Sequence, residues 1–221
     1  MDQTDQTDHQ ESQPMGHPPG QRPDDLYAAA PPPWDIGRPQ PAFLALAEGG
    51  ALRGRVLDAG CGTGEHALMA AALGHPATGF DLAGNALETA RRKAGERGLD
   101  ARFLRQDALR LAEKGELAGS GEYFDTVLDC GLLHTFSAAD RAVYLSGLRT
   151  LMPAGARCLI LAFSDRQPGD FGRPHKFARA ELEEAFSAEA GWRLDSLEPS
   201  TIDVTIDPGA VSAWLVQATR L

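Results

Sequence analysis

Short apolar runs alternate with longer amphipathic segments along most of the chain. Glycine, proline or aspartate residues bound the apolar runs, which have the length of buried strands. Strands are expected to start at Val56 and to cover 77–81, 101–106, 124–129, 157–163, 193–198 and 211–219. Helices are expected over 65–73, 84–98, 137–151 and 178–189, the third of them capped by Ser137. This alternation predicts an α/β fold with a largely parallel sheet.

A glycine-rich turn follows the first of these strands. The sequence reads V-L-D-A-G-C-G-T-G over residues 56–64, and a helix is expected directly after it. Because glycine has no Cβ and tolerates positive φ, the backbone can turn tightly here and come close to a ligand. The following helix presents free N–H groups and the positive end of its dipole to the same place. At the carboxyl end of a strand in an open α/β sheet, such a turn predicts an adenosine-containing cofactor.

Two classes of cofactor compete for this turn. Residues 60–64 form a G-x-G-x-G run, and residues 62–67 also fit the looser dinucleotide pattern that ends in alanine. Asp58 distinguishes the two classes, because its carboxylate would repel a pyrophosphate but attract a cofactor with an ammonium and a sulfonium. A dinucleotide fold also needs a second mononucleotide-binding half, and the sequence has no second glycine loop. An NAD(P)-linked oxidoreductase is therefore the weaker alternative.

The segment D-A-G-C-G-T-G at 58–64 closely resembles the first motif of class I S-adenosylmethionine-dependent methyltransferases. This resemblance implies a Rossmann-like α/β fold, with a seven-stranded, mostly parallel sheet flanked by helices and an antiparallel last strand. It also implies S-adenosyl-L-methionine as the cofactor and methyl transfer as the reaction. The residues of the motif expected to bind the cofactor are Asp58, Gly60, Cys61, Gly62 and Gly64. A sensor that binds the cofactor without turnover is a further alternative.

Acids stand at the ends of the second and third expected strands. Asp81 follows Gly64 by 17 residues and is placed, with Leu82 beside it, to bind ribose hydroxyls. Both cofactor classes use an acid at this point, so Asp81 indicates a ribose without choosing between them. In the methyltransferases that the chain resembles, the residues after the third strand flank the adenine, which implies this role for Asp107 and Ala108. A helix N-cap or a solvated loop acid is the alternative for Asp107.

The fourth expected strand ends in D-C-G-L-L-H-T-F at 129–136, which lies beside the first strand in this topology. The resemblance places methionine and substrate contacts in this segment, which implies such contacts for Asp129 and Cys130. His134 is a candidate general base for a hydroxyl acceptor, and a histidine packed at the start of a helix is the alternative. The segment has neither the Asn/Asp-Pro-Pro-aromatic motif of nucleic-acid amine methyltransferases nor a Pro-Cys nucleophile.

A tryptophan lies among prolines upstream of the core, in the segment P-W-D-I-G-R-P-Q-P at 33–41. This segment closely resembles the N-terminal part of bacterial methyltransferases related to the thiol/halide and thiopurine methyltransferases. Enzymes that methylate heterocyclic hydroxyls belong to the same neighbourhood. The resemblance implies a small-molecule acceptor, either a thiol or halide or a hydroxylated heterocycle. Trp34 and Gly37 either cover the cofactor, with the indole face toward the sulfonium, or anchor this segment to the domain.

The loop over 164–177 is long, polar and rich in glycine and proline. Loops of this length at the carboxyl edge of a sheet are often functional. Its basic side chains, Arg173, His175 and Lys176, would attract an anionic acceptor. A solvated basic turn before a helix is the alternative.

Charge and composition limit the partners. The formal net charge of −10 disfavours nucleic acid, so the expected partner is a small-molecule acceptor. Residues 1–25 hold six acids and one arginine, which predicts a disordered tail before a single domain over 26–221. No apolar run reaches 18 residues, so no membrane span is expected. The cysteines, Cys61, Cys130 and Cys158, lack paired spacing, which favours reduced thiols in a cytoplasm and no metal site. Nothing in the sequence indicates an oligomeric state.

Overall fold

Seven strands form one sheet in a computed structural model that describes residues 23–28, 31–113, 115–117, 121, 123–169 and 174–221. The strand order is β3-β2-β1-β4-β5-β7-β6. The strands are β1 (Val56–Ala59), β2 (Ala77–Asp81), β3 (Ala101–Arg105), β4 (Thr126–Cys130), β5 (Arg157–Phe163), β6 (Trp192–Asp203) and β7 (Ala210–Arg220). Strands β1 to β5 pair in parallel, and β7 is antiparallel to both of its neighbours. The predicted mostly parallel sheet with an antiparallel last strand is confirmed.

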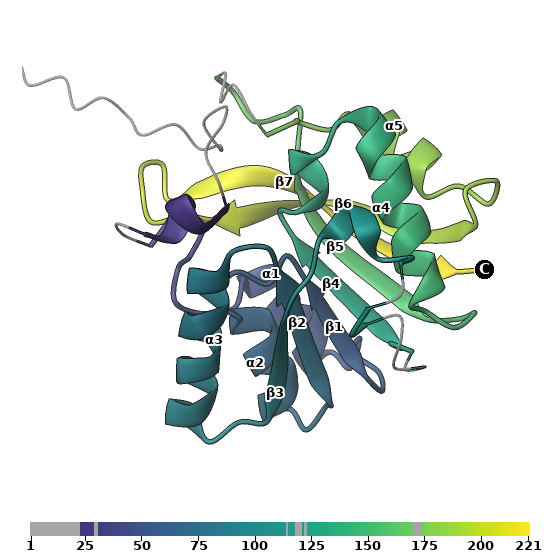
Figure 1. The fold of residues 1–221 in the computed structure, drawn as a ribbon. Coiled ribbons are helices and arrows are strands. Elements are labelled where there is room, and N and C mark those ends of the chain that lie inside the picture. Colours follow the sequence, from purple (N-terminus) through teal and green to yellow (C-terminus); the bar gives the residue numbers. More distant parts are fainter. Residues whose placement is uncertain (1–22, 29–30, 114, 118–120, 122, 170–173) are drawn as a thin grey trace, which may run out of the picture.

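Helices cover both faces of this sheet (Figure 1). They are α1 (Pro41–Glu48), α2 (Glu65–Ala72), α3 (Gly84–Arg97), α4 (Ala138–Thr150) and α5 (Arg179–Ala185). Because neighbouring strand residues point to opposite faces, Leu57 packs in the core with α4 and α5, whereas Val56 packs with α1 and α2. The central strands are thus buried on both faces, which explains their continuous apolar runs in the sequence.

Three short 3-10 helices complete the fold: η1 (Pro23–Tyr27), η2 (Ala108–Arg110) and η3 (Leu133–Thr135). The first begins inside the stretch that was predicted to be a disordered tail, so residues 23–25 differ from that prediction. Residues 1–22 lie outside the described part of the chain, and the division into a tail and one domain stays a prediction. Asp24 ties η1 to the core. Its carboxylate accepts from the backbone amide of Asn85 at 3.3 Å and pairs with the Arg105 guanidinium at 3.3 Å.

Two elements, β6 and α5, end more than two residues from their predicted ends, and both differences have physical reasons. Strand β6 continues from its predicted end at Glu198 through Pro199 to Asp203. Proline is tolerated there because β6 is the edge strand and pairs only with β7. Helix α5 ends before its predicted end at Glu189, because Phe186 turns into the core and contacts the ring of Trp192. The predicted cap at Ser137 is confirmed, since its hydroxyl accepts from the Asp140 amide at 3.2 Å.

Gly64 closes the glycine-rich turn in a conformation that excludes a side chain. Its φ is +85°, and a Cβ there would lie 2.8 Å from both the Cβ of Ala90 and the ring of Phe103. We expect Gly64→Ala to lower the free energy of unfolding by about 2 kcal/mol, from backbone strain and overpacking together. Urea denaturation measures this loss. Gly74 has the same φ of +85° with nothing within 4 Å of its Cβ position, so Gly74→Ala should lose only about 1 kcal/mol. Equal losses would show that packing at Gly64 is unimportant.

Candidate active site

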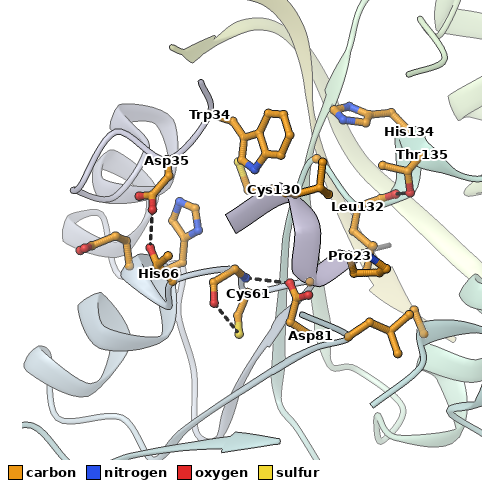
Figure 2. A pocket seen from close by; sticks show the side chains of 18 of the residues that line it. Pro23, Trp34, Asp35, Cys61, His66, Asp81, Cys130, Leu132, His134 and Thr135 are labelled. Atoms are coloured by element: carbon orange, nitrogen blue, oxygen red, sulfur yellow. Dashed lines mark hydrogen bonds between the residues drawn. The ribbon is translucent and has the colours of Figure 1, made fainter. Parts of the chain in front are cut away.

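A cavity of about 270 Å³ opens at the carboxyl ends of the central strands (Figure 2). The glycine-rich turn after β1 forms its floor, and the ends of β2, β3 and β4 form its walls. Segments from before the first strand also line it, as does Ile202 of β6. Of the residues predicted to form the site, ten line the cavity: Trp34, Gly60, Cys61, Gly62, Asp81, Leu82, Asp107, Ala108, Cys130 and His134. Gly37, Asp58, Gly64 and Asp129 are not among its lining residues.

The glycine-rich turn fits closely between its neighbours. A Cβ on Gly60 would lie 2.9 Å from the Cβ of Leu132, and one on Gly62 would lie 2.8 Å from the Tyr27 hydroxyl. Both glycines have positive φ, at +65° and +50°. The Gly62 amide donates to Oδ2 of Asp81 at 2.9 Å, which ties the turn to the end of β2. The turn therefore keeps its shape only with glycine at these positions.

Two carboxylates line one side of the cavity. Oδ1 of Asp81 accepts from the Ala83 amide at 2.8 Å, so both of its oxygens are held by backbone amides. Asp107 caps η2, because its Oδ1 accepts from the Leu109 amide at 2.9 Å. Asp107 therefore acts as a cap, as the alternative interpretation predicted, and it also lines the cavity. Its contact with the adenine stays a prediction.

The acids in β1 and β4 lie behind the cavity wall. Asp58 is 1 % exposed and its Oδ2 accepts from the Ala67 amide at 3.0 Å. Burial raises the pKa of Asp58 to about 7 and that of Asp129 to about 6. Asp129 accepts from the Leu132 amide at 2.8 Å and from the Tyr144 hydroxyl at 2.9 Å. Asp129 therefore fixes the entry to η3, and Asp58 fixes the first turn of α2.

The segment that carries Trp34 is both anchored and part of the cavity wall. Trp34 lines the cavity, and its Nε1 donates to the Tyr27 hydroxyl at 3.5 Å. The Gln40 side chain makes two hydrogen bonds to the Asp203 backbone, at 2.8 and 3.0 Å, and Arg38 pairs with the Asp203 carboxylate at 2.7 Å. Gly37 lies in an exposed turn with its amide on Oδ1 of Asp35. The two interpretations of this segment are thus compatible at Trp34.

Several residues that line the cavity were not identified from the sequence. Pro23, Leu26 and Tyr27 of η1 line the cavity, although they adjoin a tail of low complexity. Asp35, Arg38 and His66 line it as well. Asp35 and Arg38 stand within the P-W-D-I-G-R-P-Q-P segment, which was a signal for the region without identifying them. Ile202 lies beyond the predicted end of β6.

His134 lies in η3 at the opposite side of the cavity from Asp35 and His66 (Figure 2). Its ring is tilted against that of Phe163 with centroids 4.2 Å apart. Its Nδ1 accepts from the Phe163 amide at 3.2 Å, so in the neutral ring the proton resides on Nε2. Cys130 lies nearby, and burial raises the pKa of its thiol, which keeps it protonated.

The loop over 164–177 contributes Pro174 to the cavity. Arg173 lies outside the described residues. His175 is 2.9 Å from the Glu181 carboxylate, and Lys176 donates to the Gln167 carbonyl at 2.9 Å. Neither His175 nor Lys176 lines the cavity.

In the described part of the chain, no helix is long and apolar enough to cross a membrane. Among those same residues, no cluster of three or more His, Cys, Asp or Glu side chains is arranged to hold a metal ion.

Comparisons with known proteins show the family of this chain. Residues 56–155 match the family model described as a methyltransferase domain. The 2-heptyl-1-hydroxyquinolin-4(1H)-one methyltransferase of Mycobacteroides abscessus is 34% identical, over 91% of this chain and 93% of the relative. The "Probable thiol methyltransferase 2" of Arabidopsis thaliana is 28% identical, over 68% of this chain and 65% of the relative.

Solved structures show the same architecture. A structure from work on the conversion of a disulfide bond into a thioacetal group during echinomycin biosynthesis has a TM-score of 0.75 and 41% identity. It covers 86% of this chain and 85% of its own. These relatives decide between the two cofactor classes in favour of S-adenosylmethionine. The chain belongs to the S-adenosylmethionine-dependent methyltransferases.

Proposed function

We propose that the acceptor is a planar, hydroxylated aromatic heterocycle, which receives the methyl group on its hydroxyl oxygen. The observation that carries this proposal is the aromatic side of the cavity. Trp34, Phe136 and Phe163 line it with apolar surface, and His134 adds a polar group among them. Flat aromatic molecules pack well against such rings. The Mycobacteroides relative, whose name describes a hydroxyquinolinone acceptor, aligns with almost the whole chain and supports the same class.

We also propose how the cavity holds the cofactor. The tight glycine turn at Gly60, Cys61 and Gly62 suits a ligand that lies directly on the backbone. Asp81, with Leu82 beside it, suits the ribose hydroxyls, because a carboxylate accepts two hydrogen bonds at once. Asp107 and Ala108 suit the adenine at the end of β3.

Trp34 and Cys130 are proposed to flank the sulfonium end. The remaining predicted residues, Gly37, Asp58, Gly64 and Asp129, are proposed to support the site by holding its backbone, as their contacts indicate.

S-adenosylmethionine supplies an electrophilic methyl group on a sulfonium. The task of the chain is to align the acceptor oxygen with that methyl group and to keep water out. Alignment of this kind is worth up to about 7–11 kcal/mol of the barrier in favourable cases. Trp34 and η1 cover the cavity from the N-terminal side, and the aromatic rings restrict how a flat acceptor enters. His134 would hold an ionised hydroxyl through Nε2–H, since its Nδ1 is engaged with the Phe163 amide.

We therefore propose that His134 acts as a hydrogen-bond donor and not as a general base. We expect His134→Phe to slow methylation of a hydroxylated quinolinone by about 10-fold, the worth of one hydrogen bond to a charged oxygen. Steady-state kinetics with mass detection of the methylated product measures this rate. His134→Gln should restore part of it, because the amide nitrogen can donate from a similar place. A thiol acceptor, which ionises without help, should be affected less, and an equal loss with both acceptors would contradict the role.

A thiol acceptor is the second candidate, favoured by the similarity to the Arabidopsis protein. An acceptor screen separates the two classes. The purified protein is incubated with S-adenosylmethionine and matched pairs of heterocycles that carry either a hydroxyl or a thiol at the same position. We expect turnover mainly on the hydroxyl compounds. Turnover confined to the thiols would overturn the proposed acceptor, and cofactor binding without any turnover would favour a sensor.

We further infer that the enzyme acts in the cytoplasm on a small molecule, without a nucleic-acid or membrane partner. All three cysteines are free thiols, which suits a reducing compartment. The net charge of −10 opposes binding to phosphate-rich polymers. Retention on heparin or on anionic vesicles at physiological salt would contradict the inference about partners.

A further inference from the structure

A polar group of side chains lines the cavity on the side away from His134. Asp35 and His66 lie next to each other there, between Trp34 and the glycine-rich turn (Figure 2). Asp35 comes from the segment before α1, and His66 is the second residue of α2. Asp81 and Asp107 account for the nucleoside in the proposed function, which leaves this second polar group without a ligand.

Asp35 is held with its carboxylate against the glycine-rich turn. Its Oδ2 accepts from the Thr63 hydroxyl at 2.9 Å, and its Oδ1 accepts from the Gly37 amide at 3.2 Å. Thr63 in turn accepts from Lys93 at 2.7 Å, so its hydroxyl proton is directed to Asp35. The orientation of Asp35 is therefore fixed by the fold before any ligand binds.

His66 uses one ring nitrogen, Nε2, to accept from a backbone amide, which leaves Nδ1 for a ligand. Its Nε2 accepts from the Gln40 amide at 3.1 Å, and its ring contacts Phe43 edge to face at 5.0 Å between centroids. Burial lowers the pKa of His66 to about 4, so the ring is neutral and carries its proton on Nδ1. In the described part of the chain, Nδ1 makes no hydrogen bond.

Two other acids near the turn do not suit a cationic ligand. Asp58 is buried behind the wall and does not line the cavity. Glu65 lines it, but its charge is balanced by two cations, since Lys93 is 2.8 Å from Oε1 and Arg97 is 2.8 Å from Oε2. The hydrogen-bond donors to Asp35, in contrast, are the neutral Thr63 hydroxyl and Gly37 amide. Asp35 is thus the carboxylate that remains for a cation at this side of the cavity.

We propose that Asp35 and His66 bind the amino-acid end of the cofactor, with the Asp35 carboxylate on the α-ammonium and His66 Nδ1–H on the α-carboxylate. This inference rests on the cofactor that the family uses and not on the proposed acceptor. It assigns the ammonium to Asp35 in place of Asp58, the acid that the sequence motif suggested.

Titration calorimetry with three ligands tests the assignment. S-adenosylhomocysteine has both charged groups, its decarboxylated analogue keeps only the ammonium, and 5′-methylthioadenosine has neither. We expect Asp35→Asn to weaken binding of the first two by about 10- to 30-fold and that of methylthioadenosine by less than about twofold. His66→Gln, whose amide oxygen can still accept from the Gln40 amide, should weaken S-adenosylhomocysteine alone by about 10-fold.

Asp203→Asn is the matched control. It removes the ion pair with Arg38, which anchors the same segment, and Asp203 itself does not line the cavity. The affinities of this variant for the three ligands should stand in the same ratios to one another as those of the wild type. If Asp35→Asn weakens all three ligands equally, or none of them, the assignment of the ammonium is wrong. If His66→Gln weakens the decarboxylated analogue as much as S-adenosylhomocysteine, the assignment of the carboxylate is wrong. The acceptor screen is independent of these ratios, so failure of the proposed acceptor would leave them unchanged.

Discussion

Asp81→Ala is expected to weaken binding of S-adenosylhomocysteine by about 1,000-fold, the largest loss for any single side chain of the cavity. Two effects combine in this loss. The ribose would lose hydrogen bonds to a charged acceptor, each worth about 1.5–3 kcal/mol. The Gly62 and Ala83 amides would also lose the carboxylate that holds them at 2.9 and 2.8 Å, so the glycine-rich turn would no longer be fixed to β2. Titration calorimetry measures the affinity.

Two variants separate the contributions to this loss. Asp81→Asn keeps one acceptor oxygen of the same size, so it should retain an affinity between those of the wild type and Asp81→Ala. Circular dichroism should show an unchanged fold for both variants, because the strands are held by other contacts. An Asp81→Ala protein that binds S-adenosylhomocysteine within about threefold of the wild type would place the ribose elsewhere in the cavity.

The sheet was predictable because its determinants are local and repeated. The apolar run that starts at Val56 and the runs at 77–81, 124–129 and 157–163 predict buried strands. The resemblance in the glycine-rich turn supplies the arrangement of these strands in the sheet. Strand β6 was predicted too short because Pro199 usually ends a strand, and a sequence does not show which strand lies at an edge. Asp81 was placed at the end of its strand for the same local reason, whereas Asp107 was named from the resemblance; both line the cavity.

The contribution of η1 to the cavity was not predictable in this way. Leu26 and Tyr27 adjoin a polar, proline-rich stretch, and their place over the cavity depends on long-range contacts such as Asp24 with Arg105. Whether an acid faces a ligand is likewise a tertiary property. Asp58 and Asp35 are both next to glycine-containing turns in the sequence, but one side chain is buried behind the wall and the other lines the cavity.

The buried position of Asp58 predicts that the contribution of this residue to stability falls as the pH rises from about 4 to 7. The buried, neutral His66, with a pKa of about 4, contributes with the opposite sign between about pH 4 and 6.5. Burial raises the pKa of Asp58 from 3.8 to about 7, so in this range the folded state holds a proton that the unfolded chain releases. The contribution of Asp58 to the free energy of unfolding then decreases by about 1.4 kcal/mol per pH unit, or up to about 4 kcal/mol across the window. Asp129, with a pKa of about 6, adds to the same trend at its lower end.

Asp58→Asn removes one of these ionisations while keeping an oxygen that can accept from the Ala67 amide. Its new amide N–H groups add a cost that does not depend on pH, so the informative quantity is the difference between two pH profiles. Urea denaturation from pH 4.5 to 8 should show the variant gaining on the wild type as pH rises, by about 3 kcal/mol over this range. Exposed Asp100→Asn is the control and should run parallel to the wild type. Parallel profiles for Asp58→Asn as well would mean that this acid is ionised in the fold throughout. In that case the motif acid would stay charged behind the wall, and its attraction to the cofactor would again compete with that of Asp35.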